Sequence, residues 1–191
     1  MYPGTDADSA DAILAAATKV FASEATRQVT LKRVALEARV PPHVVTARWA
    51  SPAELLTEVF GRLGENLAER FPPGQMPRHG GEFDAEQGEL VDAMLSILVR
   101  SALDGMDLTE RVDRYPTIER LIQQHMDDGL DELTARYRVF ETVLVELGYR
   151  FFADQLQVAC GLTEEPEGRL RDEVNALEQM VAALPPIPSE V

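Results

Sequence analysis

Basic side chains gather in one short window of a chain that is otherwise acidic. From Arg27 to Arg48 there are five Lys or Arg residues and one carboxylate, Glu37, so the local net charge is +4. Guanidinium and ammonium groups at this density can bind phosphate oxygens and hold a protein on a nucleic-acid backbone. The same window could also be no more than a solvated basic surface, and helical spacing favours the first interpretation.

The second half of the window contains side chains that could read base edges. The spacing predicts a short helix from Pro42 to Trp49, in which Val45 and Trp49 are four residues apart and face inward. An imidazole or hydroxyl group can hydrogen-bond to a base edge, and a small apolar side chain can meet a thymine methyl group. The expected base readers and their neighbours are His43, Val44, Thr46 and Ala47, and the expected phosphate contacts are Thr30, Lys32, Arg33, Arg39 and Arg48.

The remaining charge is distributed unevenly. The 191 residues include 33 Asp or Glu against 18 Lys or Arg, a formal net charge of −15. Residues 1–64 contain seven of each sign, so residues 65–191 carry all fifteen negative units. We therefore expect weak non-specific DNA binding and a nucleic-acid surface confined to the N-terminal part.

No pattern of catalytic or metal-binding residues is found. His43, His79 and His125 lack metal-ligand spacing, no glycine loop could cradle a phosphate, and no nucleophile lies near a candidate base. A single cysteine, Cys160, excludes an internal disulfide and a cysteine-based zinc site. We expect no enzyme activity, no catalytic residues, no metal and no cofactor.

Composition indicates an ordinary globular protein, with 45% hydrophobic and 27% charged residues. The first residues are acidic where a signal peptide would be basic, and no apolar run approaches the roughly 18 residues of a membrane span. We expect a cytoplasmic chain with no membrane partner.

Helical periods between proline and glycine breaks predict an all-α fold. The expected helices run from about Asp8 or Ser9 to Ser23, from the Thr30 cap to Ala38, from Pro42 to Trp49, from Pro52 (after the Ser51 cap) to about residue 71, from Asp84 to Asp104, from Pro116 to about Asp128, from about Asp131 to Ala159 and from roughly Glu167 to Leu184. Two short helices joined by a tight turn form a helix-turn-helix, whose second helix enters the major groove. Residues 1–51 are expected to be the DNA-binding domain and residues 52–191 a ligand-binding and dimerisation domain, with helix 52–71 connecting them.

The N-terminal segment resembles the DNA-binding domain of TetR-type bacterial repressors. The matching residues align without gaps over about residues 10–60 and are Ile13–Phe21, Thr30–Ala35, Glu37–Ala38, Val40 and Leu55–Leu56. The resemblance implies a three-helix DNA-binding domain, a helical domain that binds a small-molecule effector, dimerisation through the last two long helices, and repression of a double-stranded DNA operator that the ligand relieves.

Five positions depart from the family pattern. Where the family usually has glycine, serine, glycine, tyrosine and lysine, this chain has Arg39, Pro41, His43, Thr46 and Pro52. Several of these positions face DNA in the family. The alternative is therefore a protein of the same fold that has lost sequence-specific DNA binding and acts through its helical domain.

The C-terminal region is expected to enclose a mostly apolar pocket and to form a homodimer. The candidate pocket residues are Met94, Leu98, His125, Tyr137 and Phe140, with His125 interpreted as a hydrogen-bonded core or pocket-wall residue and the acidic domain favouring a neutral or cationic ligand. Asp92, Ser96 and Arg100, at spacings of four, are either a solvated edge or a polar pocket lining. The dimer is predicted from apolar stripes on the last two long helices, which include Leu144 and Phe151 on the first and Leu170, Val174, Leu177, Val181 and Leu184 on the second.

Overall fold

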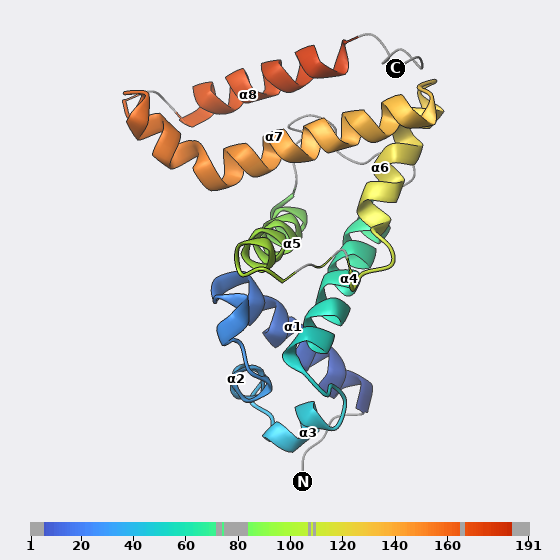
Figure 1. Ribbon diagram of the computed structural model, residues 1–191, viewed down its shortest axis with the longest axis vertical. Helices are drawn as coiled ribbons and strands as arrows, with labels where there is room; N and C mark the ends of the chain where they lie inside the picture. The colour runs from blue at the N-terminus through green and yellow to red at the C-terminus, as the bar shows by residue number, and fades with distance from the viewer. Residues whose placement is uncertain are drawn as a thin grey trace. The chain divides into compact units, whose positions relative to one another are not determined.

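The computed structural model describes residues 6–71, 74, 84–106, 108, 110–164 and 167–184, and all regular elements among them are helical (Figure 1). In chain order they are α1 (Asp6–Ser23), η1 (Thr26–Gln28), α2 (Leu31–Glu37), α3 (Pro42–Thr46), α4 (Pro52–Arg70), α5 (Ala85–Leu103), α6 (Pro116–Asp127), α7 (Glu132–Ala159) and α8 (Glu167–Ala182). The expected all-α fold class is confirmed.

The chain forms two compact units. Unit 1 comprises Met1–Glu69 and Ala85–Pro116, and unit 2 comprises Arg70–Asp84 and Thr117–Val191. Helices α4 and α5 therefore belong to the same compact unit as the N-terminal helices. The expected boundary between a DNA-binding domain, residues 1–51, and a ligand-binding and dimerisation domain, residues 52–191, is a division by function. The compact units do not test it, and it stays a prediction.

The core of unit 1 explains why its helices pack as they do. Apolar residues of α1 recur at helical spacing and are at most 1% exposed, among them Ile13, Ala17 and Phe21. They pack in one cluster with Leu55 and Val59 of α4 and with residues of α2, α3 and α5. This amphipathic pattern supplies the main free energy that holds three short N-terminal helices together.

Local side-chain caps begin α2 and α4 where the sequence predicts. The Thr30 hydroxyl accepts a hydrogen bond from the Arg33 amide at 3.1 Å. The Ser51 hydroxyl accepts one from the Glu54 amide at 3.2 Å, and the Glu54 carboxylate accepts one from the Ala50 amide at 2.8 Å. These bonds satisfy amide groups that have no partner inside the helix.

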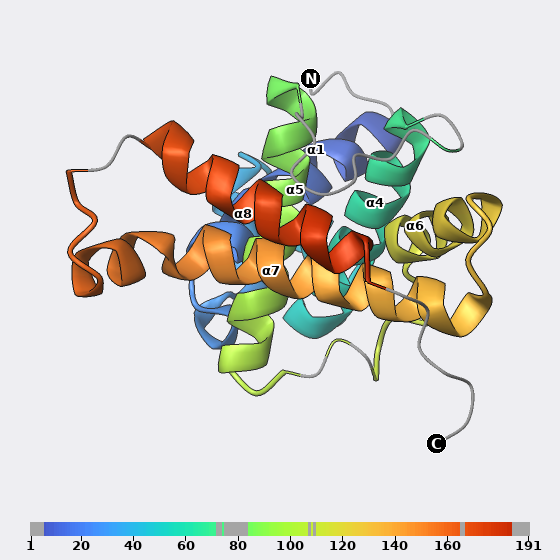
Figure 2. The same ribbon diagram turned by 90° about the horizontal axis from the view of Figure 1, so that it is seen from above.

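Unit 2 is built from α6, α7 and α8, and α7 and α8 lie side by side (Figures 1 and 2). Asp131 caps α7 by accepting hydrogen bonds from the amide of Thr134 at 3.0 Å and from its hydroxyl at 2.6 Å. Arg138 of α7 is 2% exposed and donates to the Glu141 carboxylate at 2.8 Å and to the Leu184 carbonyl at 2.6 Å. The buried guanidinium thereby joins α7 to the segment that follows α8.

No helix in the described parts of the chain combines the length and the apolar character that a membrane crossing requires.

Candidate nucleic-acid interface

Buried apolar side chains hold α2 and α3 against the rest of unit 1. Val34 and Ala35 of α2 and Val45 of α3 are fully buried, and Trp49 is 3% exposed. All four belong to the same core cluster as α1 and α4. Because their inward faces are fixed in this way, the opposite face of α3 is set by the helical period, as the sequence predicts.

The turn between α2 and α3 contains a residue in the left-handed region. Arg39 has a φ of 57°, and it is the one residue other than glycine with a positive φ in the described ranges. The Arg39 amide donates to the Leu36 carbonyl at 3.2 Å and the Val40 amide donates to the Ala35 carbonyl at 3.0 Å. This bonding pattern is the Schellman ending of a helix, in which glycine is preferred at the Arg39 position because it has no Cβ.

Helix α3 is shorter than expected, which corrects the prediction of a helix from Pro42 to Trp49. It ends at Thr46 with Ala47 as its C-cap, although the Trp49 amide still donates to the Val45 carbonyl at 3.1 Å. The chain must turn before α4 begins at Pro52, and a proline disfavours helical conformation in the residue before it. Trp49 remains buried as predicted, outside the helix.

The structure places most of the expected base readers on the surface. His43, Thr46 and Ala47 are exposed, whereas Val44 is half-buried and packs against the core. The Thr46 hydroxyl lies 3.4 Å from the His43 carbonyl of its own helix. His43, Thr46 and Ala47 thus share an accessible face, and base reading by these residues stays a prediction.

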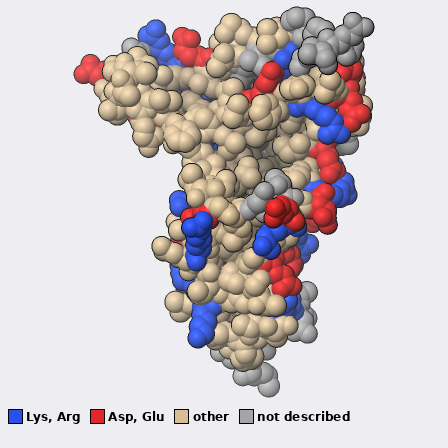
Figure 3. All heavy atoms as spheres, viewed as in Figure 1, with Lys and Arg blue, Asp and Glu red and all other residues tan. Residues whose placement is uncertain are grey.

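The five basic residues of the window differ in exposure, and Arg27, in η1, is one of the exposed ones. Lys32, Arg39 and Arg48 are exposed, and in the view of Figure 3 several Lys and Arg side chains lie over the part of unit 1 that contains α2. Arg33 instead donates from Nη1 to Glu37 at 3.0 Å and from Nε to Glu24 at 2.8 Å. The hydrogen bond to Glu37, together with Glu24, raises the pKa of Arg33 above its ordinary value. A phosphate contact by Arg33 would therefore compete with two carboxylates.

Two contacts join the C-terminal end of α5 and the residue after it to α1 and to η1, and the sequence did not reveal them. Arg100 Nε donates to the carbonyl oxygen of Ala22 at 2.9 Å, and the Arg27 amide donates to Asp104 Oδ2 at 3.3 Å. A cation at a helix C-terminus meets carbonyl groups without intrahelical partners. The polar line expected on this helix is thus divided, because Arg100 caps α1 while Asp92 and Ser96 line a groove.

The five candidate pocket residues are split between the two units. Met94 and Leu98 are half-buried against the core of unit 1. In unit 2, His125 is 8% exposed, whereas Tyr137 is 45% and Phe140 63% exposed. The burial of His125 agrees with a core or pocket-wall position, and a pocket formed from all five stays a prediction.

No cluster of three or more metal-ligating side chains occurs among the residues that the structure describes. His43 and His125 lie in different units, and His79 lies outside the described residues.

Comparisons with known proteins identify the class of molecule. No protein-family model matches the chain. An HTH-type transcriptional regulator of Mycobacterium bovis and an HTH-type transcriptional repressor of Mycobacterium tuberculosis are each 27% identical to it over 166 residues, covering 87% of this chain and 85% of the relative. These names support a transcriptional regulator of the helix-turn-helix type and specify no narrower family.

A solved structure has a similar fold. The chain is similar to the fatty acid degradation regulator FadR from Bacillus halodurans, with a TM-score of 0.53 and 15% identity over 93% of this chain and 96% of that one. At this identity the likeness shows the fold alone.

Proposed function

We propose that this protein is a TetR-like repressor that binds a double-stranded DNA operator as a homodimer and leaves it when a small molecule binds. One observation carries the proposal: α3 is anchored by the buried side chains of Val45 and Trp49 and presents His43, Thr46 and Ala47 to solvent. A short helix fixed on its inner face and polar on its outer face suits insertion into the major groove.

Exposed cations beside α3 suit contacts with the DNA backbone. Arg39 lies in the turn before α3 and Arg48 lies just after it, and Lys32 is exposed on the preceding helix α2. Phosphate contacts of this kind set orientation and register but carry no sequence information. We assign the reading of bases to His43, Thr46 and Ala47, with Val44 in a supporting position.

A homodimer through α7 and α8 is supported by apolar side chains that unit 2 leaves exposed. Leu133, Tyr137, Phe140 and Leu144 follow one another on α7 at spacings of four, three and four, and each is at least 45% exposed. On α8 and just after it, the exposed apolar residues include Leu177, Met180 and Leu184. A continuous row of exposed apolar side chains is rarely left in water. A two-fold dimer would cover these side chains and pair two DNA-binding helices.

The effector part of the proposal rests on the family resemblance. His125 is the best-buried of the candidate pocket residues, whereas the exposure of Tyr137 and Phe140 suits a covered dimer face better than a closed pocket wall. The effector is proposed to be a small molecule bound in the helical C-terminal part. A thermal-shift screen of apolar and aromatic compounds tests this part separately from DNA binding.

Selection of bound fragments from the source genome by the purified full-length protein tests the DNA-binding proposal. If each protomer neutralises about three to four phosphates, the dimer should lose affinity with a log–log salt slope of roughly −5 to −7. Arg48→Ala should weaken binding to all sequences and flatten the slope, whereas His43→Ala should change the preference at one position per half-site. Arg136→Ala, an exposed arginine of α7 in unit 2, is the matched control.

Failure of the wild type to bind any fragment at low salt would overturn the repressor proposal. The same fold acting through its helical domain alone would then take its place.

A further inference from the structure

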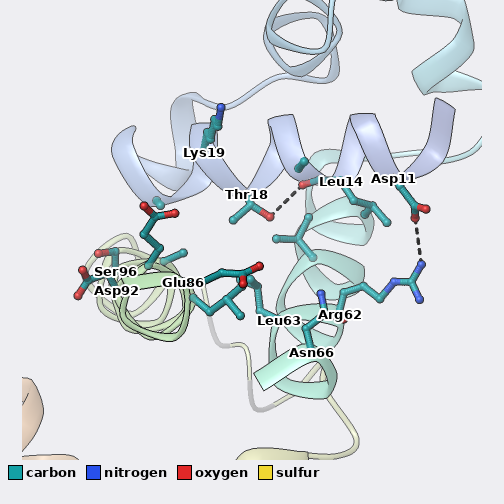
Figure 4. A pocket seen from close by; sticks show the side chains of 16 residues that line it. Asp11, Leu14, Thr18, Lys19, Arg62, Leu63, Asn66, Glu86, Asp92 and Ser96 are labelled. Atoms are coloured by element: carbon teal, nitrogen blue, oxygen red, sulfur yellow. Dashed lines mark hydrogen bonds and ion pairs between the residues drawn. The ribbon is translucent and has the colours of Figure 1, made fainter. Parts of the chain in front are cut away.

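Unit 1 contains a groove of about 800 Å³ between α1, α4 and α5 (Figure 4). Its floor is apolar, because it includes Leu14 of α1 and Val59 and Leu63 of α4, each at most 7% exposed. Neither Met94 nor Leu98 lines it, so these two expected effector-pocket residues lie outside the groove. Its size lies in the range of small-molecule sites, about 300–1,000 Å³.

One wall of the groove is acidic along its length. Glu86, Glu89 and Asp92 of α5 lie at spacings of three and share one face of the helix, followed by Ser96. Figure 4 shows Glu86, Asp92 and Ser96 along this wall. A carboxylate in the first turn of a helix also stabilises the helix itself, which accounts for Glu86. Glu89 and Asp92 lie beyond that turn and are exposed to solvent.

The basic side chains of the groove do not offset this wall. Its lining contains four carboxylates against two basic groups, Lys19 and Arg62, a net charge of −2. Arg62 is already paired with Asp11, with Nη2 3.2 Å from Oδ1. The Thr18 hydroxyl donates to the Leu14 carbonyl at 2.9 Å, so it too is committed within the protein. The net negative charge of the lining therefore favours a cation over an anion above the apolar floor.

We propose that this groove binds a hydrophobic organic cation. The apolar body of the ligand lies on Leu14, Val59 and Leu63, and its positive charge faces Glu89 and Asp92 on α5. Binding buries mainly the apolar surface of the ligand itself, because the floor residues are already nearly buried, and the acidic wall selects the sign of the charge. The wall is exposed to solvent, so its effect on a cation should weaken as salt is added.

Tetraphenylphosphonium and tetraphenylborate test the proposal because they have the same shape and opposite charge. Calorimetric titration of the full-length protein at low salt, without DNA, should give saturable binding of one phosphonium ion per chain, at least ten-fold tighter than binding of the borate. Raising the salt should weaken phosphonium binding. Equal affinity for the two ions would overturn the proposal. Because no DNA is present, the result does not depend on repressor activity.

Two pairs of variants locate the site. Glu89→Lys should weaken phosphonium binding about ten-fold, whereas Glu65→Lys, at an exposed position of α4 that does not line the groove, should change it less than two-fold. Ala15→Trp should fill the groove and abolish binding, while Glu65→Trp, at the exposed position of α4 outside the lining, should leave it intact.

The melting temperature of each variant without probe shows that it is folded, and Glu89→Gln supplies a milder change at the same position. Binding that survives Ala15→Trp, or that falls equally in Glu89→Lys and Glu65→Lys, would contradict the assignment of the site to this groove.

Discussion

The indole Nε1 of Trp49 donates a hydrogen bond to Oε2 of Glu58, 2.6 Å away. Trp49 lies just after α3 and is 3% exposed, while Glu58 lies on the exposed side of α4. A hydrogen bond to a charged acceptor is stronger than one between neutral groups. This contact therefore fixes the segment that follows the proposed DNA-reading helix against α4, which contributes Leu55 and Val59 to the core of unit 1.

Glu58→Ala should lower the free energy of unfolding by about 1 kcal/mol, because it leaves a part-buried indole N–H without its acceptor. Glu58→Gln should cost less, since the amide oxygen can still accept the bond. Urea denaturation followed by circular dichroism measures both changes. Glu65→Ala, at another exposed position of α4, is the control, and an equal effect in the two alanine variants would show that the hydrogen bond contributes nothing.

Arg39→Gly should raise the free energy of unfolding by roughly 0.5–1 kcal/mol, because Arg39 has a φ of 57° and side chains with a Cβ are disfavoured there. The helix endings at Gly105, Gly129 and Gly161 use glycine for the same conformation, with φ between 68° and 97°. Arg39→Ala keeps the Cβ and should give little or no gain. Thermal and urea denaturation compare the two variants.

The same pair separates backbone strain from charge in DNA binding. Both variants remove the Arg39 guanidinium, so both should lower operator affinity equally and flatten the salt slope. If Arg39→Ala lowers operator affinity but the more stable Arg39→Gly does not, the loss of stability and not the loss of charge explains the effect. Arg39 would then be excluded as a phosphate contact.

Features that depend on neighbours in the sequence were predicted well. The predicted caps at Thr30 and Ser51 form because a short polar side chain reaches an amide three residues ahead. The inward direction of Val45 and Trp49 follows from a spacing of four. These patterns need only the helical period and the local chain, both of which the sequence contains.

Features that depend on distant contacts could not be predicted in this way. Trp49 finds its hydrogen-bond acceptor, Glu58, on the next helix, and Arg100 donates to the carbonyl oxygen of Ala22, 78 residues away along the chain. The groove of unit 1 requires three helices to pack before it exists. The spacing of apolar residues shows which side chains lie on the same face of a helix. It does not show which other helix packs against that face.

Asp131 should make stability depend on pH on the acid side. The side-chain hydrogen bond from Thr134, followed by the bond from its amide, lowers the pKa of Asp131 below its ordinary value. A carboxyl group whose pKa is lower in the folded state stabilises the protein fully above its unfolded pKa, and this contribution is lost as the pH falls through the folded value. Asp131→Asn keeps a good N-cap but does not titrate, so it should flatten this part of the profile.

Urea denaturation at a series of pH values below neutrality measures the effect of Asp131→Asn. Thr134→Val provides a second check, because it removes the hydroxyl donor and should raise the pKa of Asp131 toward its ordinary value in a carbon-13 titration. A pKa that does not move in Thr134→Val would contradict the assigned cause.

Leu144→Glu should convert the proposed dimer to a monomer. Leu144 is 56% exposed and belongs to the apolar face of α7, and a carboxylate there would be buried without a partner in the two-fold interface. Sedimentation equilibrium at micromolar concentration should give twice the chain mass of 21.1 kDa for the wild type and a single chain for the variant. Leu103→Glu is the matched control, because Leu103 is 81% exposed on α5 and lies outside the proposed interface. If both variants remain dimeric, the apolar face of α7 is not the dimer interface. If the wild type is itself a monomer, the two-half-site operator is excluded with it, because one chain presents a single DNA-reading helix.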